Sequence, residues 1–106
     1  MTSVTFLTEG NRIIGFDATG HSGYGQEGED IVCAAVSAVV IMAESVINDE
    51  FHANAKVRNK GNADISLTLP ASCDEEESIQ AVLGGMMNTL LYLRDEYPEN
   101  IEVLEV

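Results

Sequence analysis

The chain has 106 residues, the size of one domain, and 45% of them are hydrophobic, which is enough to bury a core. Its 18 acidic and 5 basic residues give a formal charge of −13, which disfavours nucleic acids and anionic lipid surfaces as partners because both attract cations. The same charge favours a basic protein partner, although solubility alone also explains it.

The start of the chain and its apolar runs predict a cytoplasmic protein. Residues 1–10 lack the basic segment, the long apolar segment and the cleavage site of a secretory signal. The longest near-apolar run, residues 31–43, is shorter than the roughly 20 residues that cross a bilayer, so we expect no membrane span. Cys33 and Cys73 permit one disulfide at most, and in a reducing cytoplasm we expect free thiols.

A β-hairpin and a glycine-rich loop are predicted first. Residues 4–8 and 13–18 are rich in β-branched and aromatic side chains and flank a turn at residues 9–11. Residues 19–29 include four glycines, which neither a helix nor a strand tolerates cheaply. They predict a loop whose length is close to that at which loops without regular structure are usually functional.

A mostly buried helix is predicted over residues 30–49, which are nearly all apolar or small, with Asp30 as its N-cap. At 100° per residue its polar positions form one stripe. The stripe consists of Asp30, Ser37, Glu44 and Asn48. Cys33 lies at the edge of this stripe, in the first turn of the predicted helix.

Two further strands are predicted over residues 51–60 and 64–69. In the second, apolar side chains alternate with hydroxyls, as in a strand with one buried face. In the first, Lys56, Arg58 and Lys60 share one face, which gathers three of the five basic residues. Such a face can hold a ligand carboxylate, but more often it balances nearby acids.

A second helix is predicted after Pro70. Asp74 and Glu77 have the spacing of a capping box, and apolar residues at helical spacing follow until the helix ends near Arg94. Gly84-Gly85 in its middle suggests a close approach of two backbones, either a helix crossing or a dimer contact.

Residues 101–106 predict a short closing strand. The predicted order is therefore β-β-α-β-β-α-β in a single domain over residues 1–106. This order is typical of the α+β class, here a two-layer sandwich of two helices on a mostly antiparallel sheet.

A cysteine at a helix start and a nearby histidine suggest nucleophilic chemistry. Unpaired N–H groups in the first helical turn favour the thiolate of Cys33, and His21 in the glycine-rich loop could act as its general base. Free N–H groups of the loop and the helix start could hold an oxyanion. Against this, Glu27, Glu29 and Asp30 lie close in sequence and oppose a thiolate.

From spacing alone, an inert core thiol and an unengaged loop histidine are the commoner outcome. Cys73, beside the start of the second helix, is expected to be structural. The two histidines and two cysteines lack the spacing of a zinc site, so we expect no metal and no cofactor.

The run Gly20-His21-Ser22-Gly23, followed by Gly-Glu-Asp-Ile-Val-Cys-Ala-Ala-Val-Ser at residues 28–37, resembles the signature of the ribosomal-processing cysteine proteases, the Prp family. The hairpin, both helices and the last strand extend the resemblance over essentially the whole chain. The resemblance implies a catalytic dyad in which Cys33 is the nucleophile and His21 the general base.

The resemblance also implies a homodimer and a mobile glycine-rich loop that becomes ordered over the substrate. The implied substrate is the N-terminal extension of a large-subunit ribosomal protein, cut after an aromatic pair and before a small residue. We assign the residues of the substrate loop to Gly20, Ser22, Gly23, Gly25 and Gly28. Asp30 or Ser37 could orient the dyad, and no third catalytic group is assigned.

Two alternatives remain at this point. The first is a non-enzymatic acidic dimer that binds a basic ribosomal protein segment as an assembly factor, with Cys33 merely packed. The second is a thiol acyltransferase or thioesterase using the same dyad, for which the sequence offers no phosphate-binding glycine motif and no basic cleft.

Overall fold

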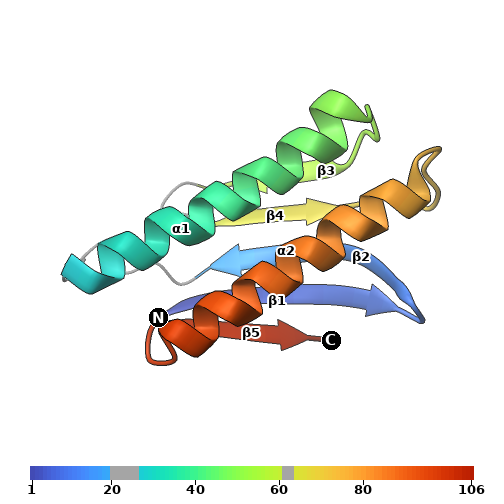
Figure 1. Cartoon of the computed structure of the whole chain (residues 1–106). Coiled ribbons are helices and arrows are strands. Elements are labelled where there is room, and N and C mark those ends of the chain that lie inside the picture. Colours follow the sequence, from blue (N-terminus) through green and yellow to red (C-terminus); the bar gives the residue numbers. More distant parts are fainter. Residues whose placement is uncertain (20–26, 61–63) are drawn as a thin grey trace.

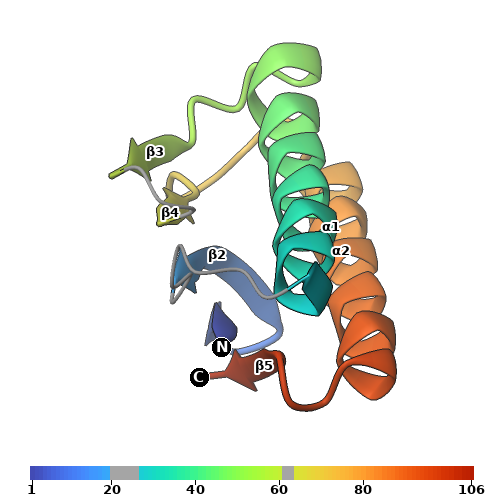
Figure 2. The same cartoon turned by 90° about the vertical axis from the view of Figure 1, so that its left-hand side faces the viewer.

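A five-stranded sheet with two helices on one of its faces forms the described part of the computed structural model, residues 1–19, 27–60 and 64–106 (Figures 1 and 2). The elements in chain order are β1 (Thr2–Glu9), β2 (Arg12–Thr19), α1 (Glu27–Glu44), η1 (Ser45–Glu50), β3 (Lys56–Asn59), β4 (Ile65–Thr68), α2 (Glu76–Glu96) and β5 (Ile101–Glu105). Since η1 is a π-helical continuation of α1, the predicted order β-β-α-β-β-α-β and the α+β two-layer class are confirmed.

The strands are arranged in the order β3-β4-β2-β1-β5. Three pairs are antiparallel, β1 with β2, β2 with β4 and β3 with β4, whereas β5 runs parallel to β1 (Figure 1). A parallel neighbour requires a crossover connection, and α2 supplies it by carrying the chain back along the sheet before β5 begins. The hairpin turn between β1 and β2 uses Gly10 at φ 64°, a left-handed conformation that glycine adopts without strain.

Helix α1 begins earlier than predicted. It starts at Glu27, so Asp30 is its fourth residue and not its N-cap, and Gly28 belongs to the helix and not to the loop. Cys33 is consequently the seventh helical residue, in the second turn.

One face of α1 and η1 packs on the sheet, through residues that are all buried: Val32, Val36, Val40, Ala43 and Ile47. The opposite face is apolar as well, yet Ile31 is 58% exposed and Ile41 55% exposed. The expectation of no membrane span considered only the near-apolar run of residues 31–43, whereas the helix that contains this run continues to Glu50. Within the described residues, Ile31–Glu50 is a helix long and apolar enough to cross a membrane by length and composition, a test that the core helix of a soluble protein also passes.

Helix α2 shows the predicted apolar face but a different start. Its buried residues are Ile79, Leu83, Met86 and Leu90, and it ends at Glu96, two residues beyond Arg94. The predicted capping box is wrong: the helix starts at Glu76, and in the described part of the chain no side-chain bond from Glu75 caps it.

Side chains of α2 instead fix its start against β2. Arg12 donates to both carboxylate oxygens of Glu76, from Nε at 2.7 Å and from Nη2 at 3.1 Å. Gln80 makes two bonds of 2.8 Å to Ile13, accepting from its N–H and donating to its carbonyl. These tertiary contacts replace a local cap.

The glycine pair in α2 does not mark a helix crossing. A Cβ added to Gly84 or to Gly85 would meet no described atom within 4 Å outside the helix itself. Two backbones do come close at a different glycine, Gly15 in β2. A Cβ added there would clash with the carbonyl oxygen of Leu67 in β4.

Strand β3 is shorter than predicted, because residues 51–55 form a turn. His52 and Asn54 adopt left-handed conformations with φ 50° and 59°, which a strand excludes. The side chain of Asn48 binds both the N–H and the carbonyl of Ala55, at 2.8 and 3.1 Å, and holds the chain there. Pairing with β4 can begin only at Lys56. In β4 and just beyond it, Leu67 and Leu69 point inward as predicted.

Candidate active site

Cys33 lies where α1 passes over the start of β1. Its side chain is half-buried, and its sulfur is 3.6 Å from the hydroxyl oxygen of Thr2. Thr2 is 6% exposed, and its backbone N–H donates to the carbonyl of Asn100 at 2.8 Å. The hydroxyl is therefore held at a fixed position from which it can donate a hydrogen bond to a thiolate.

Sequence reasoning missed Thr2. It is separated from Cys33 by 31 residues, and a threonine at the start of a strand looks like any other β-branched strand residue. The signal would have been the combination of strand register and helix position, which become known only once α1 is placed on the sheet.

A narrow hollow between α1 and the sheet opens beside the sulfur. It leaves a volume of about 10 Å³ for the centres of water molecules, enough for about one water. The residues around it are Thr2, Ala18, Cys33, Val36, Ser37, Val40 and Ile65. The structure thus brings Ser37, one of the two predicted orienting residues, to the same wall as Cys33, among mainly apolar neighbours.

The remaining predicted site residues are only partly placed. His21, Gly20, Ser22, Gly23 and Gly25 lie outside the described residues. The backbone of Asp30 belongs to α1, three residues before Cys33.

The position of Cys33 in the second turn changes one step of the chemical argument. The partial positive charge of a helix start falls off within its first turn, so it reaches Cys33 more weakly than predicted. The Thr2 hydroxyl, 3.6 Å from the sulfur, can compensate for this weaker effect by donating a hydrogen bond to a thiolate.

The second thiol has a different environment. Cys73 is half-buried, and its sulfur is 3.9 Å from Nη2 of Arg12, in the same cluster as Glu76. Burial raises the pKa of the Cys73 thiol and the Glu76 carboxylate adds to this, whereas Arg12 opposes it. At neutral pH this raised pKa leaves Cys73 less ionised than an ordinary thiol.

Metal chemistry finds no support in the described residues: no group of three or more His, Cys, Asp or Glu side chains among them is placed to hold an ion. Among the described residues, the site places a thiol beside a hydroxyl.

Fold and site together define the class: an α+β domain whose candidate nucleophile is a cysteine on a helix packed against a mixed sheet. Residues 1–102 match the family model described as cysteine protease Prp. The chain therefore belongs to this family and is a cysteine protease, which confirms the resemblance seen in the sequence. Family membership also favours a peptidase over the assembly factor and the acyl-transferring enzymes.

Known relatives agree with this assignment. The ribosomal processing cysteine protease Prp of Bacillus subtilis (strain 168) is 30% identical over 95 residues, covering 86% of this chain and 84% of the relative. Crystal structures of the ribosomal processing protease Prp of S. aureus, one with a substrate peptide and one with a covalently linked product peptide, match with TM-scores of 0.88 and 0.84 over the whole of both chains. SMU.848 from Streptococcus mutans matches with a TM-score of 0.85 over 100% of this chain and 96% of its own. The three structures are 21 to 24% identical to this chain and show the fold it shares with them.

Proposed function

We propose that this chain is the protease that removes the N-terminal extension of a large-subunit ribosomal protein, with Cys33 as nucleophile and His21 as general base. The observation that carries the proposal is the half-buried Cys33 sulfur beside the fixed hydroxyl of Thr2. The B. subtilis relative is a ribosomal processing protease by name, and the S. aureus protein was crystallised with substrate and product peptides.

In the proposed mechanism the Cys33 thiolate attacks the scissile carbonyl and His21 transfers the proton to the leaving amine. Backbone N–H groups near the start of α1 hold the oxyanion of the tetrahedral intermediate. Water, activated by His21 as base, then hydrolyses the thioester of the acyl-enzyme, which releases the N-terminal peptide product and regenerates the Cys33 thiol. Thr2 is a positioning residue in this scheme, because its hydroxyl stabilises the thiolate before attack.

Covalent geometry supports His21 as the partner of Cys33. Ala18 lines the hollow beside the sulfur, and three residues of chain span at most roughly 11 Å. His21 follows Ala18 by three residues in the sequence, and this short separation supports the pairing that we propose.

We also propose a loop that covers the substrate, and we assign to it all but one of the residues that the sequence predicted. The hollow has room for about one water, so a peptide must bind outside it, beneath a covering segment. We assign that segment to Gly20, Ser22, Gly23 and Gly25. Gly28 is excluded from the hinge because it is helical.

The charge of the chain supports a basic substrate. A formal charge of −13 attracts and orients a Lys/Arg-rich protein, which is the character of proteins that bind ribosomal RNA. A cytoplasmic location, where such substrates are made, is part of the proposal.

A homodimer is also part of the proposal. The exposed apolar face of α1 is the surface that we assign to the second copy; it consists of Ile31, Ala34, Ala38, Ile41 and Met42. An apolar stripe of this kind is typical of an interface core. Ile41→Glu should shift the chain from dimer to monomer in sedimentation equilibrium, and an unchanged dimer would remove this surface from the proposal.

The experiment that tests the proteolytic reaction is incubation with the N-extended ribosomal protein, followed by intact mass measurement. Cys33→Ser and His21→Ala should each slow cleavage by at least about a thousandfold, because both groups act in the bond-breaking step. Cys73→Ser is the matched control and should cleave at the normal rate. Cleavage retained by Cys33→Ser would remove the assigned nucleophile, and binding without cleavage by the unaltered chain would support an assembly factor.

A further inference from the structure

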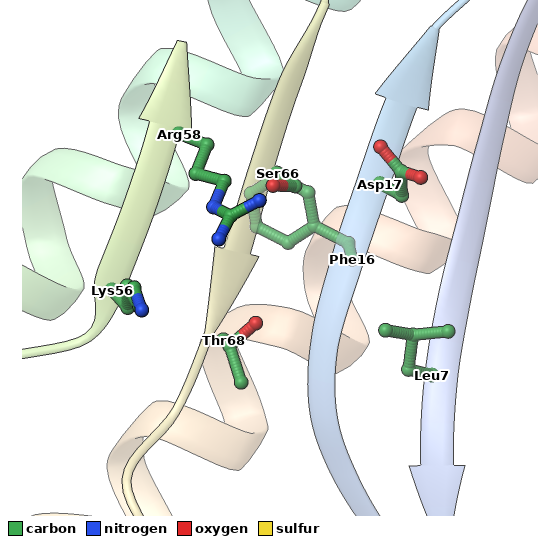
Figure 3. A pocket seen from close by; sticks show the side chains of 7 residues that line it. All are labelled: Leu7, Phe16, Asp17, Lys56, Arg58, Ser66 and Thr68. Carbon is green, nitrogen blue, oxygen red and sulfur yellow. The ribbon is translucent and has the colours of Figure 1, made fainter.

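A larger cavity lies on the face of the sheet opposite the helices, above β3, β4 and β2 and at the edge of β1 (Figure 3). It is open to solvent and has a volume of about 450 Å³, within the usual range of small-molecule sites. It lies behind the strands that wall the hollow beside Cys33, so it is separate from the candidate active site.

One row of side chains crosses this cavity and carries opposite charges at its ends. Arg58 of β3 pairs with Ser66 of β4, and Ser66 pairs with Asp17 of β2. In Figure 3 the Arg58 side chain extends over β4 toward the Ser66 hydroxyl, and Asp17 projects from β2 beyond it. The row therefore presents a guanidinium, a hydroxyl and a carboxylate in sequence.

The neighbouring row explains why there is a cavity at all. Lys56 pairs with Thr68, Thr68 with Gly15, and Gly15 with Leu7. Because Gly15 has no side chain, the row has a gap between Thr68 and Leu7. The close approach of β2 and β4 at Gly15 excludes any side chain from this position, so the gap is built into the sheet.

The two cations of the cavity have no partner in the described part of the chain. Neither Lys56 nor Arg58 makes an ion pair or a hydrogen bond with a described residue. Their cross-strand neighbours are hydroxyls, although the chain has 18 acidic residues that could have balanced them. Lys56 and Arg58, which no described residue pairs with in a chain of charge −13, therefore form a local site for an anion.

The charged side chains that line the cavity determine which kind of anion fits it. The planar fork of an arginine suits a carboxylate, which it can bind through two parallel hydrogen bonds. Asp17 at the far end repels a second negative charge and accepts a hydrogen bond from an ammonium group. We propose that this cavity binds a small zwitterion of the amino acid or short-peptide class, with its carboxylate at Lys56 and Arg58 and its ammonium at Asp17.

The size of the ligand follows from the sheet. β3 and β2 are two strand spacings apart, roughly 10 Å, and the reach of Arg58 over β4 shortens the gap between the charges. A dipeptide has the length to bridge them, and the Ser66 and Thr68 hydroxyls can bind its amide. Leu7 offers an apolar contact at the cavity edge.

The test is titration of the ¹⁵N-labelled chain with alanylalanine, followed by amide chemical shifts at constant ionic strength. Saturable shifts are expected at Ser66 and Thr68. N-acetyl-alanylalanine lacks the ammonium and should bind several-fold more weakly, and alanylalanine amide lacks the carboxylate and should not bind. Equal binding of the amide form, or the absence of saturable shifts at both residues, would overturn the proposal.

Variants of the cavity residues distinguish binding at this site from a general effect of the charge of the chain. Lys56→Gln combined with Arg58→Gln should weaken binding by at least about tenfold, whereas Arg94→Gln, which alters a cation that is paired with Asp95 on α2, should not change it. Asp17→Asn leaves the cations in place and should make the free and N-acetylated dipeptides bind equally. Unchanged binding in the double variant, or an unchanged preference in Asp17→Asn, would contradict the assignment.

Discussion

Cys33 and Cys73 are both half-buried and neither is in a disulfide, but different groups surround them. Cys33 lies in the second turn of α1, and Cys73 lies three residues before α2. Cys33 faces a neutral hydroxyl that can donate a hydrogen bond to sulfur. Cys73 lies beside the Arg12–Glu76 ion pair, where burial and the carboxylate raise its pKa and outweigh the nearby cation. Exposure does not distinguish these thiols, whereas the groups that contact them do.

The largest effect expected from this comparison is on alkylation. At neutral pH, iodoacetamide should modify Cys33 faster than Cys73, because the raised pKa of Cys73 lowers the fraction of that thiol present as thiolate. Peptide mass mapping over a time course measures both rates in the same sample. Equal rates in the native chain would show that the two environments do not differ in the way we describe.

A smaller effect should follow from removing the hydroxyl beside Cys33. Thr2→Val keeps the shape of the side chain and deletes a hydrogen bond worth about 1 kcal/mol, so alkylation of Cys33 and peptide cleavage should both slow about fivefold. Thr2→Ser keeps the hydroxyl and should restore both rates. If Thr2→Ser is as slow as Thr2→Val while both remain folded by circular dichroism, the hydroxyl contributes by packing alone.

The smallest effects concern the carboxylate beside Cys73. Glu76→Gln removes a group that, after burial, raises the pKa of Cys73, so alkylation of Cys73 should accelerate while that of Cys33 stays the same. An unchanged Cys73 rate would assign its raised pKa to burial alone.

The same variant should alter the pH dependence of stability. The hydrogen bond from Arg12 holds the pKa of Glu76 below its usual value, so the carboxylate stabilises the folded state fully above the unfolded pKa and loses this effect as the pH falls through the folded pKa. Because the Glu76 side chain is 37% exposed, we expect the variant to be at most about 1 kcal/mol less stable at neutral pH. Urea unfolding at neutral and acidic pH measures this, and a difference that grows in acid would contradict it.

The sequence was sufficient for the fold because periodicity reports burial directly. The alternation around Leu67 and the helical spacing from Ile79 to Leu90 each identified the face that packs in the core. The predicted ends of the elements were less accurate. The start of β3 was missed because His52 and Asn54 adopt left-handed conformations, and no glycine in this segment indicates such a turn. The start of α2 depends on Arg12, which is 64 residues away from Glu76 in sequence.

The candidate site could be predicted in part, because only some of its residues belong to a local sequence pattern. Cys33 belongs to a contiguous motif, so its helix and its motif identified it together. Thr2 and the charged rows of the open sheet face come from strand pairing, which local patterns do not specify. Gly15 shows this most clearly, since its role is visible only from the carbonyl of Leu67 in the adjacent strand.

The parallel pairing of β5 with β1 has a consequence for synthesis. The residue that contacts the Cys33 sulfur is itself held by Asn100, and Thr2 pairs with Ile101 at the start of β5. A nascent chain synthesised only as far as residue 90 contains Cys33, His21 and both hairpin strands, but it lacks Asn100 and Ile101, which hold Thr2 in place. The arrangement around the thiol is therefore completed only after translation has passed the last strand, which delays the finished site until almost the whole chain has left the ribosome.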